Sequence, residues 1–181
     1  MEIYSTNPQI QQMQNKAYFA IGLTLFFFVS YIFYQNAAFI CLAVALGVRG
    51  YLYYGIKKQT QNKKILLNFA ISLGIVLAGL VVMGIVYFVL DFFKISKETL
   101  SSISYVIMLI ASLASLFYVY KMFLELKIMF DQKLFLYCFG TYALGSILLQ
   151  FDSHLLIALG FLIFTGGAVI EFLSWKQIEK I

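Results

Sequence analysis

The chain has 181 residues, of which 62% are hydrophobic and only 12% are charged. A soluble globular domain is closer to half apolar and one quarter charged, so this composition excludes an ordinary soluble domain. The 13 Lys and Arg residues outnumber the 8 Asp and Glu residues, and the apolar residues form long uninterrupted blocks. We therefore predict a multi-pass membrane protein.

The apolar blocks have the length of membrane-spanning helices. A helix rises 1.5 Å per residue, so a hydrocarbon core of about 30 Å needs about 20 apolar residues. Helices are required because lipid offers no hydrogen-bond partner to an exposed backbone. The predicted fold is an all-α, six-helix transmembrane bundle over residues 17–175, with spans at 17–34, 37–56, 65–90, 101–120, 134–151 and 154–175.

The placement of lysine predicts the orientation of the chain, because cytoplasmic loops of membrane proteins are enriched in Lys and Arg. One side of the predicted bundle carries Lys16, Lys57, Lys58, Lys63, Lys64, Lys121, Lys127, Lys133, Lys176 and Lys180. The opposite side carries only Lys94 and Lys97. We expect a plasma (inner) membrane protein with cytoplasmic tails at residues 1–16 and 176–181.

Aromatic residues near the span ends favour the same boundaries. Amphipathic rings prefer the headgroup level, where their polar atoms meet water. An aromatic belt is therefore expected on the cytoplasmic side, with members that include Tyr18, Tyr51, Tyr53, Tyr54 and Trp175.

The six spans group into three hairpins, because the outer turns at 35–36 and 152–153 have only two residues each. When the first hairpin is shifted onto the third, Gly22 aligns with Gly140 and Lys58 with Lys176. Internal repeats are common in membrane folds, so we hypothesise an ancient hairpin duplication.

The second helices of the first and third hairpins share a pattern of spaced glycines and a terminal lysine. They are Leu42–Lys58 (LAVALGVRGYLYYGIKK) and Leu156–Lys176 (LIALGFLIFTGGAVIEFLSWK). With the short outer turns and cytoplasmic ends, this layout resembles the HdeD-like acid-resistance membrane proteins. The resemblance implies a stress-associated inner-membrane protein, and it supplies no catalytic residues to carry over. The high Phe and Tyr content and the long third span depart from that family.

Two charged residues, Arg49 and Glu171, lie inside predicted spans, where ionisable groups are strong functional candidates. Each has a small residue four positions earlier on the same helix face, Ala45 and Gly167 respectively. Small residues permit close helix contacts in lipid, so one hypothesis is an Arg49–Glu171 ion pair that joins the first and third hairpins. In the alternative, each side chain snorkels separately to the cytoplasmic headgroups.

Other polar residues are weaker candidates. Three could line a cavity within the bundle: Asn68, Tyr142 and Gln150. A polar mouth on the outer side could bind a metal or relay protons, and its members would be Asp91, Asp152 and His154. Their spacing matches no ligand motif, and solvated loop residues are the simpler interpretation, so we predict neither metal nor cofactor.

Small residues recur every four positions in the third span, at Ala70, Gly74 and Ala78. This ladder predicts a close helix contact, either within the chain or with a second copy or another membrane protein. In the fourth helix, Lys121 and Glu125 are four positions apart and can form a supporting ion pair. The expected partners are membrane lipids and, through the third span, such a second protein chain.

No motif for nucleophilic catalysis, nucleotide binding or metalloprotease chemistry occurs, so we predict that the chain is not an enzyme. The lysines follow membrane topology and give no reason to expect nucleic acid. The leading hypothesis is a non-enzymatic membrane protein that acts in stress tolerance or as a subunit of a larger complex. The alternative is a small transporter or channel component, such as the substrate-binding subunit of a vitamin-uptake system. An interior pocket with several polar groups would favour the alternative.

Overall fold

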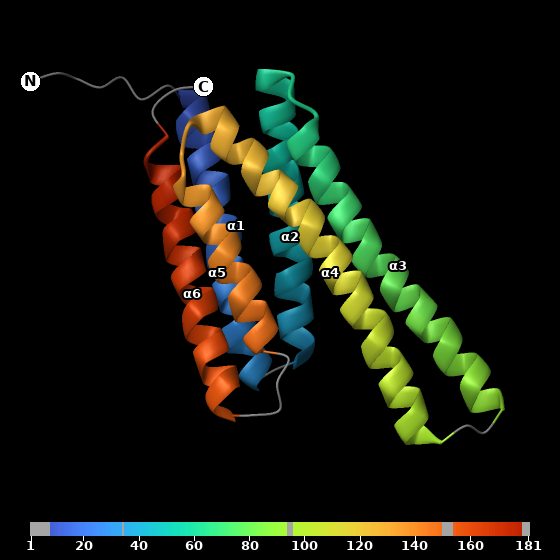
Figure 1. The fold of residues 1–181 in the computed structure, drawn as a ribbon. Coiled ribbons are helices and arrows are strands. Elements are labelled where there is room, and N and C mark those ends of the chain that lie inside the picture. The colour runs from blue at the N-terminus through green and yellow to red at the C-terminus, as the bar shows by residue number, and fades with distance from the viewer. Residues whose placement is uncertain (1–7, 34, 94–95, 150–153, 179–181) are drawn as a thin grey trace, which may run out of the picture.

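The computed structural model describes residues 8–33, 35–93, 96–149 and 154–178 (Figure 1). The described residues form six α-helices and no strand, which confirms the all-α, six-helix prediction for this part of the chain. The helices are α1 (Pro8–Phe33), α2 (Gln35–Thr60), α3 (Lys64–Phe92), α4 (Lys97–Phe130), α5 (Leu134–Leu148) and α6 (His154–Lys176).

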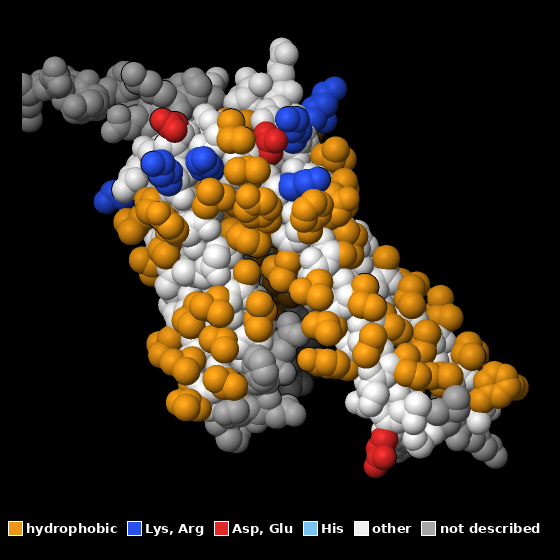
Figure 2. Space-filling view, viewed as in Figure 1, with side chains coloured by type: hydrophobic (Ala, Val, Ile, Leu, Met, Phe, Trp, Pro, Cys, Tyr) orange, Lys and Arg blue, Asp and Glu red, His pale blue; other side chains and the backbone are white. Residues whose placement is uncertain are grey.

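Three of the described helices are long and apolar enough to cross a membrane. They cover Lys64–Leu90, Glu98–Phe130 and Leu155–Lys176, and α5 is equally apolar but has only 15 residues. Figure 2 shows apolar side chains over the outward surface of α3 and α4. A soluble monomer rarely exposes so continuous an apolar surface, whereas a helix in contact with lipid requires it.

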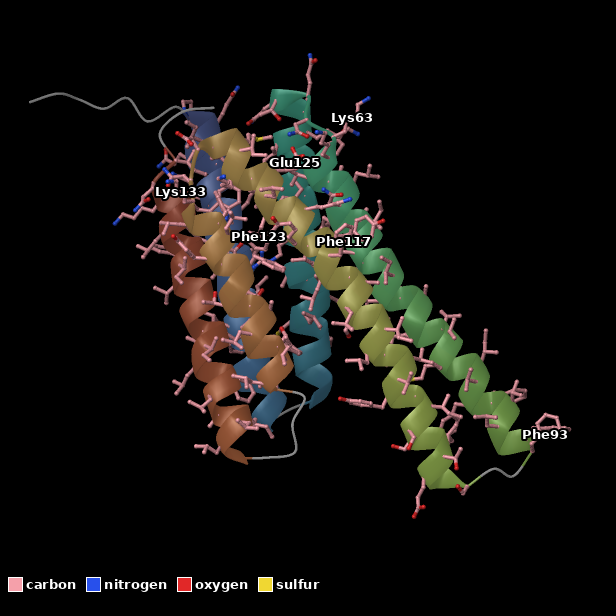
Figure 3. All side chains as sticks on the ribbon, in the orientation of Figure 1. Lys63, Phe93, Phe117, Phe123, Glu125 and Lys133 are labelled. Atoms are coloured by element: carbon pink, nitrogen blue, oxygen red, sulfur yellow. The ribbon has the colours of Figure 1, made fainter. Side chains whose placement is uncertain are left out.

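Charged side chains gather at one end of the molecule, where α1 begins and α6 ends (Figure 2). Figure 3 places Lys63, Lys133 and Glu125 at this end and Phe93 at the opposite tip of the α3–α4 hairpin. We call the first end the lysine-rich end. The distribution follows the lysine asymmetry of the sequence.

Local hydrogen bonds define several helix ends. The Ser96 hydroxyl caps α4 by accepting from the backbone N–H of Thr99 at 3.3 Å. Asp131 ends the same helix in the left-handed conformation, with φ of 50°. Before α3, the Asn62 side-chain oxygen accepts from the backbone N–H of Lys64 at 2.9 Å.

Helices α1 and α4 extend furthest beyond the predicted spans at the lysine-rich end. Helix α1 begins at Pro8 instead of residue 17, and α4 ends at Phe130 instead of residue 120. The extra turns of α1 pack on the end of α6, where the Gln14 amide donates to the carbonyl of Trp175 at 2.8 Å. Hydropathy marks only the apolar part of a helix. It therefore does not predict additional helical turns that are polar and are stabilised by contacts with other helices.

Consecutive helices pack as pairs, α1 with α2, α3 with α4 and α5 with α6. Helix α1 also contacts α6, α4 contacts α5, and α2 contacts α3. Figure 1 shows the α3–α4 hairpin leaning away from the other four helices toward its far tip. Three hairpins are thus present in the described residues, while their origin by duplication stays a prediction.

The α3–α4 contact does not use the predicted ladder of small residues. The two helices are in close contact at Gly79, where an added Cβ would lie 2.7 Å from the Cβ of Ala111. Ala70, Gly74 and Ala78 are exposed on α3, and a Cβ at Gly74 would meet no atom within 4 Å. The prediction that this ladder packs within the chain is wrong, because α3 turns a neighbouring face toward α4.

Glu125 pairs with the turn before α3 instead of with Lys121. Its Oε1 lies 3.4 Å from Nζ of Lys64, and its Oε2 accepts from the Asn62 amide at 3.3 Å. Nζ of Lys121 lies over the Phe117 ring, 4.4 Å from its centroid. The prediction of a Lys121–Glu125 pair is therefore wrong, because tertiary packing supplies each side chain with another partner.

Two residues of the expected aromatic belt belong to the core. Trp175 is fully buried, with ring centroids of Phe130 and Phe135 at 5.7 and 5.4 Å. Tyr53 is also buried, with its ring 5.1 Å from that of Phe69. Aromatic packing therefore seals the interior at the lysine-rich end.

Candidate functional site

Arg49 on α2 and Glu171 on α6 form an ion pair inside the bundle. The two guanidinium nitrogens Nη1 and Nη2 donate to Oε1 and Oε2 of Glu171 at 2.7 and 2.9 Å. The Glu171 side chain is only 3% exposed and that of Arg49 only 13%. The planar guanidinium matches a carboxylate with two parallel hydrogen bonds, a geometry that lysine does not offer. The structure thus brings these predicted site residues together and joins the first hairpin to the third.

Tyr142 on α5 is the third member of this cluster. Its hydroxyl donates to Oε2 of Glu171 at 2.7 Å. The Tyr142 ring lies against Gly167, one helical turn before Glu171, where an added Cβ would be 3.0 Å from Cδ1 of the ring. Glu171 accepts three hydrogen bonds in all, and this compensates for the burial of its charge.

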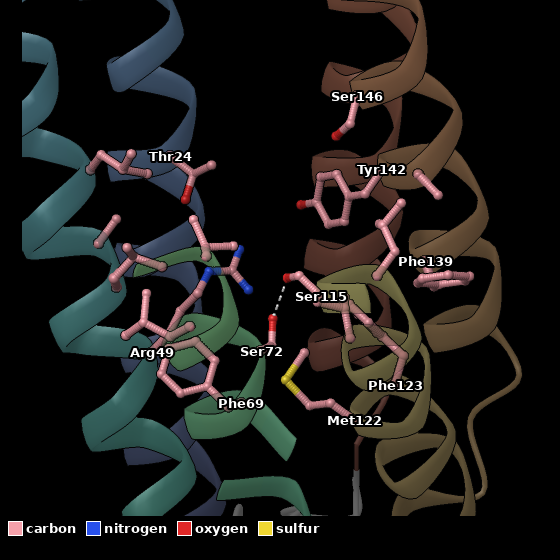
Figure 4. A pocket seen from close by; sticks show the side chains of 18 of the residues that line it. Thr24, Arg49, Phe69, Ser72, Ser115, Met122, Phe123, Phe139, Tyr142 and Ser146 are labelled. Atoms are coloured by element: carbon pink, nitrogen blue, oxygen red, sulfur yellow. Dashed lines mark hydrogen bonds between the residues drawn. The ribbon is translucent and has the colours of Figure 1, made fainter. Parts of the chain in front are cut away.

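An interior cavity of about 340 Å³ lies beside the Arg49–Glu171–Tyr142 cluster. All six helices contribute side chains to its wall. Figure 4 shows the Arg49 guanidinium and the Tyr142 hydroxyl pointing toward one another, and both donate to Oε2 of Glu171. Most of the wall is apolar, as in ligand pockets where a few polar groups fix orientation.

Two serines add a polar contact to the cavity wall. Ser72 on α3 and Ser115 on α4 are buried, and their hydroxyls lie 2.8 Å apart (Figure 4). Sequence reasoning missed both residues. A serine within an apolar span is a weak signal, because its hydroxyl can bond to the backbone of its own helix.

Tyr53 is the third residue that sequence reasoning missed as part of the site. It lines the cavity one helical turn after Arg49. Its buried hydroxyl has no hydrogen-bond partner among the described residues. An unpartnered buried hydroxyl is costly, so such a group calls for an explanation.

The other predicted site residues do not join the cluster. Asn68 is half-buried near the start of α3 and does not line the cavity. Gln150 and Asp152 lie outside the described residues, as do the side chains of Asp91 and His154. Within the described ranges, no group of three His, Cys, Asp or Glu side chains is placed to hold a metal ion.

Comparison with known proteins gives no match to a family model, a curated protein or a solved structure. The resemblance to the HdeD-like proteins stays a prediction. The chemistry of the site therefore rests on its own geometry: a neutralised ion pair, a tyrosine that supports it, and a largely apolar cavity beside them.

Proposed function

We propose that the chain is a non-enzymatic, six-span membrane protein that binds a small molecule inside the bilayer. Such a protein acts as a small transporter or as the substrate-binding subunit of one. The observation that carries this proposal is the cavity of about 340 Å³, a size within the range of ligand pockets. Arg49, Ser72, Ser115 and Tyr142 place polar groups on its otherwise apolar wall.

The proposal includes six spans and cytoplasmic termini. Helices α1 and α2 have 26 residues each, which corresponds to about 39 Å at 1.5 Å per residue. Each is long enough to cross a core of about 30 Å. The concentration of lysine at one end supports the assignment of that end to the cytoplasm.

The proposed binding function is tested by identifying the small molecules that co-purify with the protein. The full chain is purified in mild detergent, and small molecules are extracted with organic solvent and identified by mass spectrometry. Ala143→Phe fills the cavity from α5, whereas Leu144→Phe on the same helix adds its ring to an exposed position. We expect a molecule in the wild type and in Leu144→Phe that is lost from Ala143→Phe. Equal extracts from all three proteins would contradict the proposal.

A second candidate function is a membrane subunit of a larger assembly, including one in stress tolerance. It is favoured by the exposed small residues Ala70, Gly74 and Ala78, where another helix could approach closely. Gly74→Leu would block such an approach, and Gly84→Leu is a matched control because both glycines are exposed with no neighbour within 4 Å. Loss of a co-purifying chain in Gly74→Leu alone would support this function. A wild-type chain that purifies alone as a monomer would contradict it.

A further inference from the structure

We propose that the interior cavity binds an uncharged lipophilic molecule that carries a hydrogen-bond acceptor, such as a carbonyl oxygen. We further propose that this molecule enters from the bilayer between α4 and α5. The inference rests on the proposed binding function and specifies the ligand class and the route.

The size and lining of the cavity favour a lipophilic body. A cavity of about 150 Å³ already holds benzene, so about 340 Å³ has room for a flexible molecule of about twice that size. Most of the apolar wall comes from α2, α3 and α4, and it includes Leu42, Leu46, Leu73, Val76, Leu116 and Val119. A hydrocarbon chain that moves from lipid to these side chains meets surroundings of similar polarity and leaves no polar group of its own unpaired.

The charge balance of the wall favours an uncharged ligand. Arg49 is the only Lys or Arg that lines the cavity among the described residues, and Glu171 already neutralises it through two hydrogen bonds. An anionic or cationic ligand would therefore enter a buried site without a counter-charge. Burial of an uncompensated charge is far more costly than burial of a neutral polar group.

The polar groups of the wall that remain free are hydrogen-bond donors, so the polar end of the ligand must be a hydrogen-bond acceptor. Arg49, Ser72 and Ser115 line the cavity and carry N–H and O–H donors. The pair with Glu171 occupies only two of the five N–H donors of Arg49. The Ser72–Ser115 bond uses one of the two hydroxyl hydrogens. A carbonyl oxygen accepts from such donors, whereas a hydrocarbon leaves them unsatisfied.

The position of the opening favours entry from lipid. Figure 2 shows a hollow between α4 and α5, with apolar side chains on its described edges and set away from the lysine-rich end. Toward that end, α4 and α5 are joined by aromatic contacts, with ring centroids 5.3 Å apart for Tyr120 and Phe139 and 6.5 Å apart for Phe123 and Phe135. A molecule dissolved in the bilayer meets this opening directly, while cytoplasmic water meets the closed end.

The test compares three probes of similar chain length on the full protein in phosphatidylcholine nanodiscs. The probes are 2-undecanone, undecane and decanesulfonate, and binding is measured from the rise of Tm with the mole fraction of probe in the membrane. We expect 2-undecanone to bind about five- to tenfold more tightly than undecane, because one hydrogen bond separates the two. The double variant Ser72→Ala/Ser115→Ala should remove most of this preference, and Ser101→Ala, at an exposed position, should keep it.

Three results would overturn the inference. Equal binding of undecane and 2-undecanone, unchanged in Ser72→Ala/Ser115→Ala, would mean that the wall does not donate a hydrogen bond to the ligand. Tightest binding of decanesulfonate would refute the charge argument. Failure of all three probes would refute the ligand class, and the extraction comparison with Ala143→Phe would then decide the proposed binding function independently.

Discussion

Gly167 on α6 lies directly against the ring of Tyr142 on α5. An added Cβ at Gly167 would be 3.0 Å from Cδ1 and 3.1 Å from Cε1 of that ring. This close approach of the two helices places the Tyr142 hydroxyl 2.7 Å from Glu171, one turn further along α6. The glycine therefore determines how the buried carboxylate is satisfied.

Gly167→Ala should destabilise the protein by about 1–3 kcal/mol, because the ring of Tyr142 and the side chain of Thr141 must move to admit the methyl group. Gly166→Ala is the matched control, since a Cβ there meets no atom within 4 Å. It should be neutral or stabilising by about 0.5–1 kcal/mol through helix propensity. The free energy of unfolding in detergent distinguishes the two, and equal effects would contradict the assigned contact.

The α3–α4 crossing offers a second comparison of glycines. Gly79→Ala should weaken the hairpin by about 1–3 kcal/mol, because its Cβ would lie 2.7 Å from that of Ala111. Gly74→Ala places its methyl group in open space and should not weaken it. Unfolding measurements on the monomeric protein check this difference. If Gly74→Ala were the more damaging substitution, the crossing would lie on the ladder of small residues after all.

Two tyrosine substitutions should change the free energy of unfolding in opposite directions. Tyr53→Phe removes a buried hydroxyl without a described partner and should stabilise the ligand-free protein by about 1 kcal/mol or more. Tyr142→Phe removes a donor to the buried carboxylate of Glu171 and should destabilise it by about 1.5–3 kcal/mol. Both are measured as free energies of unfolding without added lipophile. Loss of stability in both variants would show that Tyr53 has a partner in the folded protein.

The orientation can be measured with reporters fused to each end of the chain. We expect green fluorescent protein to fluoresce at both termini and alkaline phosphatase to be inactive there, because the lysine-rich end is assigned to the cytoplasm. A fusion at the outer turn near residues 94–97 should give the reverse pattern. An active phosphatase at the C-terminus would contradict the assignment.

The helical fold could be predicted because apolar blocks of this length have few alternatives in a membrane. The contact between Arg49 and Glu171 was one of two interpretations, and the helix faces of Ala45 and Gly167 pointed toward it. Lone charges in apolar spans stand out in a sequence, so their pairing is easier to anticipate than the pairing of serines.

The cavity and its other polar groups could not be predicted, because they depend on how whole helices cross. The rotation of α3 against α4 brings Ser72 to Ser115 and Gly79 to Ala111, and it leaves Gly74 exposed. The packing of α2 against its neighbours buries Tyr53, whose ring lies 5.1 Å from that of Phe69 on α3. Neighbouring residues point in directions about 100° apart around a helix. In a segment that is apolar on all sides, periodicity alone does not show which of these directions faces the neighbouring helix.

The link between Arg49 and Glu171 is the feature on which the cavity wall most depends, and reversal of both charges tests it most directly. Arg49→Glu and Glu171→Arg alone should each lose about 3–5 kcal/mol of unfolding free energy, because each leaves buried like charges together. The double variant should recover much of that loss, though not all, since Tyr142 would then face a guanidinium. The same exchange of Lys64 and Glu125, a pair in which the lysine is 72% exposed, should change stability by less than about 1 kcal/mol. A double variant as unstable as the sum of its single variants would contradict the link between the two hairpins.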